Sequence, residues 1–177
     1  MLKLYKKTEG STQYWEAWER EGSVVIHTGV LGDEGEVEEI VLSDGEDASE
    51  IIAAESLTVL SEGYMEVSSD DHGHLILQYK MKGDWAEDSA VEKRHAVEDM
   101  IDQCLGWTGN GHCDGGDTGS GTVNIFSFVV DPAIAKKTIL DVLKEEKLLD
   151  GATLALQNDE SYEVLWPEKH NGEFSII

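Results

Sequence analysis

Residues 109–121 contain the side-chain types best suited to chemistry. Six of these thirteen residues are glycines, and an apolar run follows them. Glycine tolerates positive φ and lets a ligand approach the backbone closely. Carboxylate and hydroxyl oxygens bind hard cations, whereas imidazole and thiol groups bind softer ones. If this chain holds a small ligand or a metal ion, the candidate residues are His112, Cys113, Asp114, Asp117 and Ser120.

The same stretch lacks the features of a phosphate-binding loop and of a nucleophilic active site. It contains no lysine, its aspartates would repel phosphate, and the residues after it predict a strand instead of a helix N-terminus. Ser120 lacks the Gly-x-Ser-x-Gly context of a hydrolase, and acidic neighbours should raise the pKa of the Cys113 thiol. We therefore expect no catalytic residue and no cofactor, and we favour a structural turn or bulge over a metal site.

Composition restricts the partners of this chain. Its 177 residues include 13 Lys and Arg against 37 Asp and Glu, which gives a net charge of −24. Such a field repels nucleic acids and anionic membranes, so we expect neither as a partner, whereas it would attract a basic protein. No export signal or membrane-spanning run is visible, and the two cysteines do not form a disulfide framework, which together predict a cytoplasmic protein with reduced thiols.

The first third of the chain predicts a sheet covered by one helix. Alternating apolar residues separated by glycine-containing turns indicate four antiparallel strands, and acidic N-cap residues followed by apolar residues at helical spacing predict a helix over 46–61. The four expected strands cover residues 2–7, 13–20, 23–31 and 36–42.

This first module, over about residues 1–67, resembles the WGR domain. The resemblance is carried by residues 3–5, 14–16, 24–29, 32 and 35, and by the sequence Gly-Tyr-Met-Glu-Val at 63–67. It implies a small sheet-plus-helix module of the kind found in DNA-damage-responsive poly(ADP-ribose) polymerases. Thr28-Gly29-Val30 stands where the family has its Trp-Gly-Arg triplet, so the aromatic and guanidinium groups that would contact DNA are missing.

The remainder predicts a second α+β module. We expect a linker at 68–74 and then strand 75–81, helix 88–105, a glycine-rich loop, strand 123–130, helix 132–147 and strands 152–156 and 161–166. This order is close to a ferredoxin-like split β-α-β sandwich over residues 75–177. An additional strand at 112–117, paired with 123–130, is the alternative to the loop.

These observations favour a non-catalytic acidic protein that works by protein binding. A basic partner could be neutralised in the manner of an immunity protein or a nucleic-acid mimic. The alternatives are a small-ligand or metal-binding protein that uses residues 109–121, and residual nucleic-acid binding through the WGR-like face. Exposed tryptophans and the residues at the triplet position are the candidate interface residues, namely Trp18, Thr28, Val30, Trp107 and Trp166.

Overall fold

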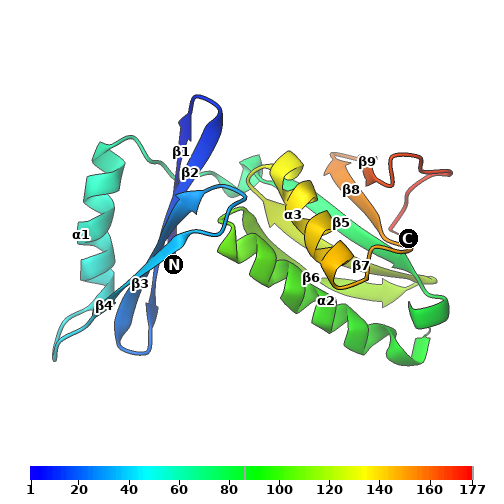
Figure 1. Ribbon diagram of the computed structural model, residues 1–177, viewed down its shortest axis with the longest axis horizontal. Helices are drawn as coiled ribbons and strands as arrows, with labels where there is room; N and C mark the ends of the chain where they lie inside the picture. The colour runs from blue at the N-terminus through cyan, green and yellow to red at the C-terminus, as the bar shows by residue number, and fades with distance from the viewer. Residues whose placement is uncertain (86, 177) are drawn as a thin grey trace. The chain divides into compact units, whose positions relative to one another are not determined.

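The computed structural model describes residues 1–85 and 87–176, an α+β chain with two antiparallel sheets (Figure 1). The chain forms two compact units. The N-terminal unit contains Met1–Asp70 together with Trp107–Gly109, and the C-terminal unit contains the rest of the described chain. The assignment of 107–109 corrects the expectation that every residue after 74 belongs to the second module. The reason is hydrogen bonding, because the Gly32 N–H donates to the carbonyl of Thr108 over 3.0 Å and the Tyr5 hydroxyl donates to that of Gly109 over 3.1 Å.

The N-terminal unit is built on a four-stranded meander, as its turn signals predict. Its strands lie in the order β1-β2-β3-β4 and are antiparallel. Glu21 and Gly22 connect β2 to β3, and both have positive φ, as a two-residue type I′ turn requires. The bounds are β1 Leu2–Thr8, β2 Ser11–Arg20, β3 Ser23–Val30 and β4 Glu36–Val41.

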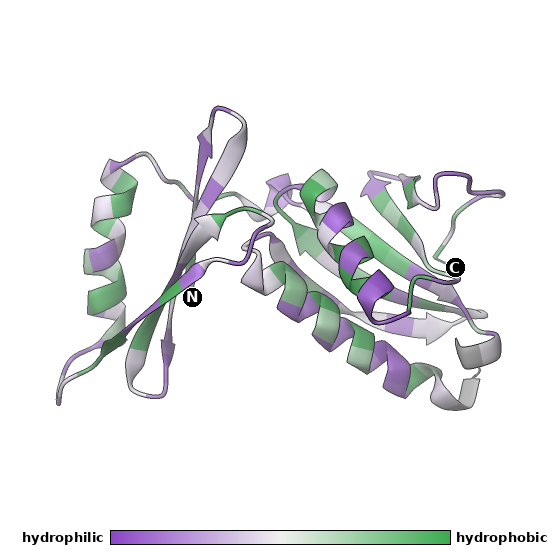
Figure 2. Cartoon of the chain, viewed as in Figure 1, coloured by the Kyte–Doolittle hydropathy of each residue, from purple (hydrophilic) through white to green (hydrophobic). Residues whose placement is uncertain are grey.

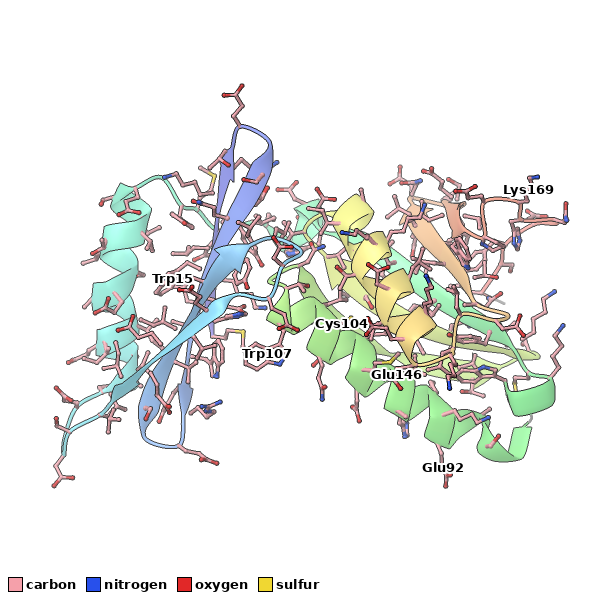
Figure 3. The ribbon with its side chains drawn as sticks, in the orientation of Figure 1. Trp15, Glu92, Cys104, Trp107, Glu146 and Lys169 are labelled. Atoms are coloured by element: carbon pink, nitrogen blue, oxygen red, sulfur yellow. The ribbon has the colours of Figure 1, made fainter. Side chains whose placement is uncertain are left out.

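A single helix, α1 (Ala48–Ser61), covers one face of this sheet. The Asp47 carboxylate caps its first turn by accepting a hydrogen bond of 2.8 Å from the Ser49 N–H. Trp15 lies between the sheet and α1 (Figure 3), in an apolar cluster that includes Leu4, Val24 and Ile51. The predicted helix over 46–61 is therefore confirmed, with its first helical residue two positions later.

The C-terminal unit has a five-stranded antiparallel sheet in the order β6-β7-β5-β8-β9. The loop expected at 109–121 is largely a strand, so the alternative of an additional strand is the correct one. The expected linker 68–74 also contains a short 3-10 helix, Ser69–Asp71, and the first two residues of β5. The bounds are β5 Gly73–Lys80, α2 Glu87–Trp107, β6 Gly111–Gly119, β7 Thr122–Val129, α3 Pro132–Glu145, β8 Thr153–Asn158 and β9 Ser161–Trp166, with a 3-10 turn at Gly83–Trp85.

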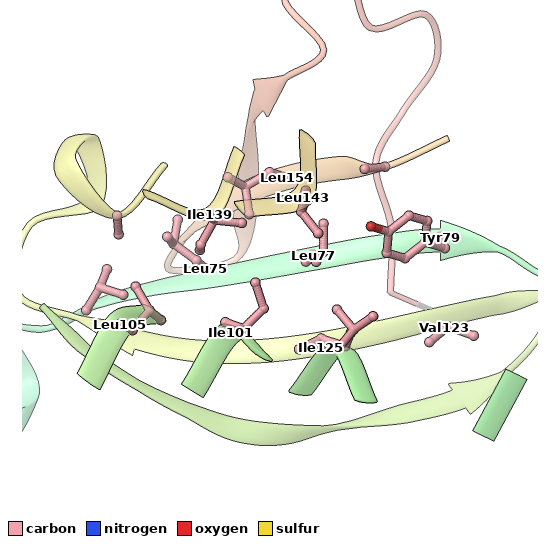
Figure 4. Packing of buried hydrophobic residues seen from close by; sticks show 14 of the residues in the cluster. Leu75, Leu77, Tyr79, Ile101, Leu105, Val123, Ile125, Ile139, Leu143 and Leu154 are labelled. Atoms are coloured by element: carbon pink, nitrogen blue, oxygen red, sulfur yellow. The ribbon is translucent and has the colours of Figure 1, made fainter. Parts of the chain in front are cut away.

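Helices α2 and α3 pack on one face of this second sheet. The alternating apolar side chains of β5 and β7 meet the apolar stripes of both helices there (Figure 4). Asp131 and Pro132 begin α3 as predicted, since the Asp131 carboxylate accepts hydrogen bonds from the N–H groups of residues 133 and 134. On the opposite face, Phe174 from the C-terminal segment packs against Ile76 and Ala155.

Candidate functional site

Residues 109–121 form a bulged edge strand and its hairpin turn. Strand β6 pairs with β7 on both sides of a bulge between Cys113 and Gly116, where residues 114 and 115 lie opposite the single residue 126, so β6 has one extra residue. Ser120 and Gly121 both have positive φ and make the two-residue turn into β7. The glycines therefore serve a bulge and a turn, which is the structural alternative to a ligand loop.

The candidate ligand residues of this stretch have separate environments. The Asp117 carboxylate accepts a 2.7 Å hydrogen bond from the Asn124 side-chain amide, whose oxygen accepts one of 2.8 Å from Gln78. The Cys113 N–H donates to the Asp102 carboxylate over 3.0 Å. His112, Asp114 and Ser120 are exposed. Within the described ranges, no three His, Cys, Asp or Glu side chains form a group that could hold a metal ion.

The two thiols are held in their protonated form. Burial raises the pKa of Cys113 to about 11, with further contributions from Glu98, Asp102 and Asp114. Burial likewise raises the pKa of Cys104 to about 12. The expected direction for Cys113 is confirmed, but burial and not the acidic neighbours is the main cause. Cys104 and Cys113, which both lie in described segments, are not joined in a disulfide.

A buried chain of polar side chains crosses the N-terminal sheet on the face opposite α1. His27, which is fully buried, lies 2.8 Å through Nδ1 from Glu16 Oε1 and 3.0 Å through Nε2 from the Tyr14 hydroxyl. The second oxygen of Glu16 forms an ion pair of 2.8 Å with Lys3 Nζ. Neighbouring strands bring these residues together, because Lys3 pairs with Glu16 across β1 and β2, and Glu16 with His27 across β2 and β3. Every ring nitrogen and carboxylate oxygen in the chain thus has a partner.

Glu16, His27 and Tyr14 combine a carboxylate, an imidazole and a hydroxyl in one hydrogen-bonded series, as proton relays do. Burial, followed by the negative charge of Glu16, raises the pKa of Tyr14 well above its usual value, so its hydroxyl stays protonated and is a poor nucleophile. Glycines surround it: a Cβ at Gly29, Gly35 or Gly109 would lie within 3 Å of Tyr14 atoms. The Tyr14 side chain also helps to hold residues 107–109 in the N-terminal unit, because its hydroxyl lies 3.4 Å from the Trp107 carbonyl oxygen and its ring lies against Gly109.

Sequence reasoning missed this chain. The available signal was Glu16 between two apolar residues of the second expected strand, together with His27 at the end of the apolar run of the third. These two strands were already expected to pair.

The candidate interface residues are divided between the units. Trp18 and Trp107 flank the His27 ring edge to face, with ring centroids 6.4 and 5.1 Å from it, and Trp107 remains 46% exposed. Thr28 is half-buried and Val30 is exposed on the same strand. Trp166 lies in the other unit, half-buried against its core. The five residues therefore do not form one site.

The outer side of α1 is an unexpected apolar surface. Ala53, Leu57 and Leu60 recur at helical spacing, and the two leucines are 69% and 44% exposed. Figure 2 shows hydrophobic segments along α1 that alternate with hydrophilic ones. We name Ala53, Leu57 and Leu60 the α1 stripe. Its surroundings in the sequence are acidic, because residues 21–79 contain fifteen Asp and Glu and no Lys or Arg.

In comparisons with known proteins, no family model, no curated protein and no solved structure matches this chain. Among the helices in the described residues, none is both long enough and apolar enough to cross a membrane.

Proposed function

We propose that this protein acts by binding a basic, amphipathic protein segment on the α1 stripe, without catalysis. The observation that carries the proposal is an exposed apolar stripe within a 59-residue region that has fifteen acidic residues and no lysine or arginine. Exposed apolar surface with a polar rim is typical of protein-binding sites. A helix with apolar and cationic faces complements it, because its apolar face would cover the leucines while its cations meet the acidic rim.

Exposed glutamates near both ends of α1 support the proposal that the partner is basic. Glu46 and Glu50 are exposed near the N-terminal end of α1, and Glu62 is exposed at its C-terminal end. The long-range field would speed association with a basic partner, and the two leucines would supply the short-range affinity. Neutralisation of the partner's positive surface is the functional consequence that we propose.

Beside this function, we propose a fold family for each of the two units. We propose that the N-terminal unit is a WGR-like module without a DNA-contacting triplet. We also propose that the C-terminal unit is ferredoxin-like, a reading supported by the element order β5-α2-β6-β7-α3-β8 and by the strand order β6-β7-β5-β8, to which β9 adds an edge.

The test uses a labelled synthetic peptide that contains only leucine and lysine and has leucines at helical spacing. Fluorescence anisotropy should show binding by the full chain, and the double substitution Leu57→Ser with Leu60→Ser should weaken it at least about tenfold, because each leucine contributes ~1 kcal/mol of apolar contact. Both side chains are exposed, so stability should change little.

Two controls make this test specific. A peptide of equal charge with its leucines replaced by serine should bind much more weakly. Val41→Ser, which changes an exposed apolar residue of the same unit outside the α1 stripe, should leave affinity unchanged. Equal binding by the wild type and the double variant would refute the proposal.

A further inference from the structure

The C-terminal unit contains a hollow that reverses the charge of the rest of the molecule. Its volume is about 730 Å³, within the range of small-molecule sites. The end of β5, the 3-10 turn after it, α2 and the connection from α3 to β8 all contribute residues to its wall. Four lysines and one histidine line it, namely Lys80, Lys82, Lys93, Lys147 and His170.

This concentration of positive charge is unusual for the composition. The whole chain has 13 Lys and Arg against 37 Asp and Glu, yet four of those cations meet at one hollow. Of the lining residues whose side chains the structure describes, Asp150 is the only acidic one. Among these same described residues, Lys80, Lys82 and Lys147 take part in no ion pair within 4.0 Å. Grouped ammonium ions repel one another, so a bound anion would relieve a cost that the unliganded protein carries.

The backbone at Lys147 provides a second and independent indication. Helix α3 ends in a Schellman motif, in which the Leu148 N–H donates to the Leu143 carbonyl over 2.7 Å and the Lys147 N–H to that of Lys144 over 3.2 Å. The central residue of this motif is usually glycine because its φ is positive, and Lys147 has φ of 60°. A lysine therefore occupies a strained position that glycine would fill more easily. Strain of this kind is often retained where the side chain has a function.

An aromatic pair fixes the wall beside the lysines. The Trp85 ring stacks on the Tyr79 ring, with centroids 4.2 Å apart and planes 17° apart, and both rings are largely buried. The Tyr79 hydroxyl donates to the Leu148 carbonyl over 2.7 Å, which ties the residue after Lys147 to β5. The lysine-bearing segments thus share a rigid support, and preorganisation lowers the cost of binding.

We infer that this hollow binds a small, multiply charged phosphate compound, such as a polyphosphate or a nucleoside triphosphate. Lysine ammonium groups bind phosphate oxygens as point charges, and four of them match an anion with three or four charges. The remaining surface favours a compact ligand, because a long nucleic acid would extend beyond the hollow into the −24 field. This site lies in the unit that does not contain the α1 stripe, so it is additional to the proposed function.

The experiment is isothermal titration calorimetry of the full chain with sodium tripolyphosphate and, separately, with ATP. We expect one site per chain, and we expect Lys82→Gln with Lys147→Gln to weaken binding of both compounds at least tenfold. Lys136→Gln with Lys137→Gln removes the same charge from α3 outside the hollow and should change affinity less than twofold. Equal affinity for the two compounds assigns recognition to the phosphates alone, whereas tighter ATP binding adds a contact to the nucleoside.

Two results would overturn the inference. One is the absence of heat and of thermal stabilisation with either compound when ionic strength is matched by sodium chloride. The other is an equal loss of affinity in the two double variants, which would show that binding of tripolyphosphate and ATP depends on the total charge of the protein and not on the lysines of the hollow. Unchanged near-ultraviolet circular dichroism of both variants would verify that the fold is intact.

Discussion

Residue 29 must be glycine because the neighbouring Tyr14 side chain leaves no room for a Cβ, and not because its own φ is positive. A Cβ there would lie 2.7 Å from the Tyr14 hydroxyl oxygen, in a space that the buried Glu16-His27-Tyr14 chain has already filled. Of the three residues at the expected triplet position, the glycine is the one whose role the structure explains.

We predict that Gly29→Ala will lower the free energy of unfolding by about 1–3 kcal/mol, because overpacking displaces the Tyr14 ring and disturbs its hydrogen bonds. Urea titration followed by tryptophan fluorescence measures this change. Gly119→Ala is the matched control, since a Cβ at Gly119 meets nothing within 4 Å. Equal effects of the two substitutions would contradict the argument.

The raised pKa values of the two cysteine thiols make the stability of the folded protein depend on pH. In the folded state the pKa values of Cys113 and Cys104 are raised to about 11 and about 12, from 9.0. The unfolded chain therefore loses these protons first, so their contribution to stability is fully present below pH 9 and is lost as the pH rises toward 11–12. Labelling by a thiol reagent should stay slow in the folded protein at pH 8 and become fast in urea. Fast labelling of both thiols in the folded protein at pH 8 would be inconsistent with these pKa values.

Helix α3 begins with residues that favour a helix start but ends with a residue that is unfavourable at its position. Its N-terminus follows the preferred Asp-Pro pattern, whereas its C-terminus places Lys147 where glycine is preferred. If the lysine serves the hollow, stability has been given up for binding, as happens at many functional sites.

We predict that Lys147→Gly will raise the free energy of unfolding by about 0.5–1 kcal/mol, because it relieves the left-handed conformation, and that it will weaken tripolyphosphate binding. Lys137→Gly, in the interior of the same helix, should instead destabilise by about 1 kcal/mol and leave binding unchanged. Chemical denaturation and calorimetry measure the two effects. A destabilised Lys147→Gly protein would show that the lysine side chain has a structural role.

The molecule as a whole carries a charge of −24, which opposes its own compact state. Raising sodium chloride from about 10 mM to about 150 mM shortens the Debye length from roughly 30 Å to 8 Å and screens this repulsion. We therefore predict that the midpoint of thermal unfolding will rise by a few degrees over this range. Scanning calorimetry measures it, and an equal concentration of a neutral osmolyte is the control. A midpoint that falls with salt would mean that attractive ion pairs outweigh the net repulsion.

What the sequence determines about this protein depends on interactions between near neighbours. Alternation along β2, the Glu21-Gly22 turn and the Asp131-Pro132 cap involve residues a few positions apart, so the α+β class and most element bounds could be predicted. The net charge follows from the composition alone. Strand β6 was harder, because glycines and a bulge obscure the alternation in its sequence.

Only the tertiary structure decides which distant residues meet. Tyr5 reaches Gly109 across 104 positions, Glu16 meets His27 inside the sheet, and Lys80 and Lys147 line one hollow although 67 positions separate them. No local pattern encodes such meetings, because they follow from how each sheet is ordered and how its helices pack. The candidate phosphate site therefore depends on the tertiary structure. The glycine-rich stretch, whose residue types made it the first place to look for a ligand site, forms an edge strand.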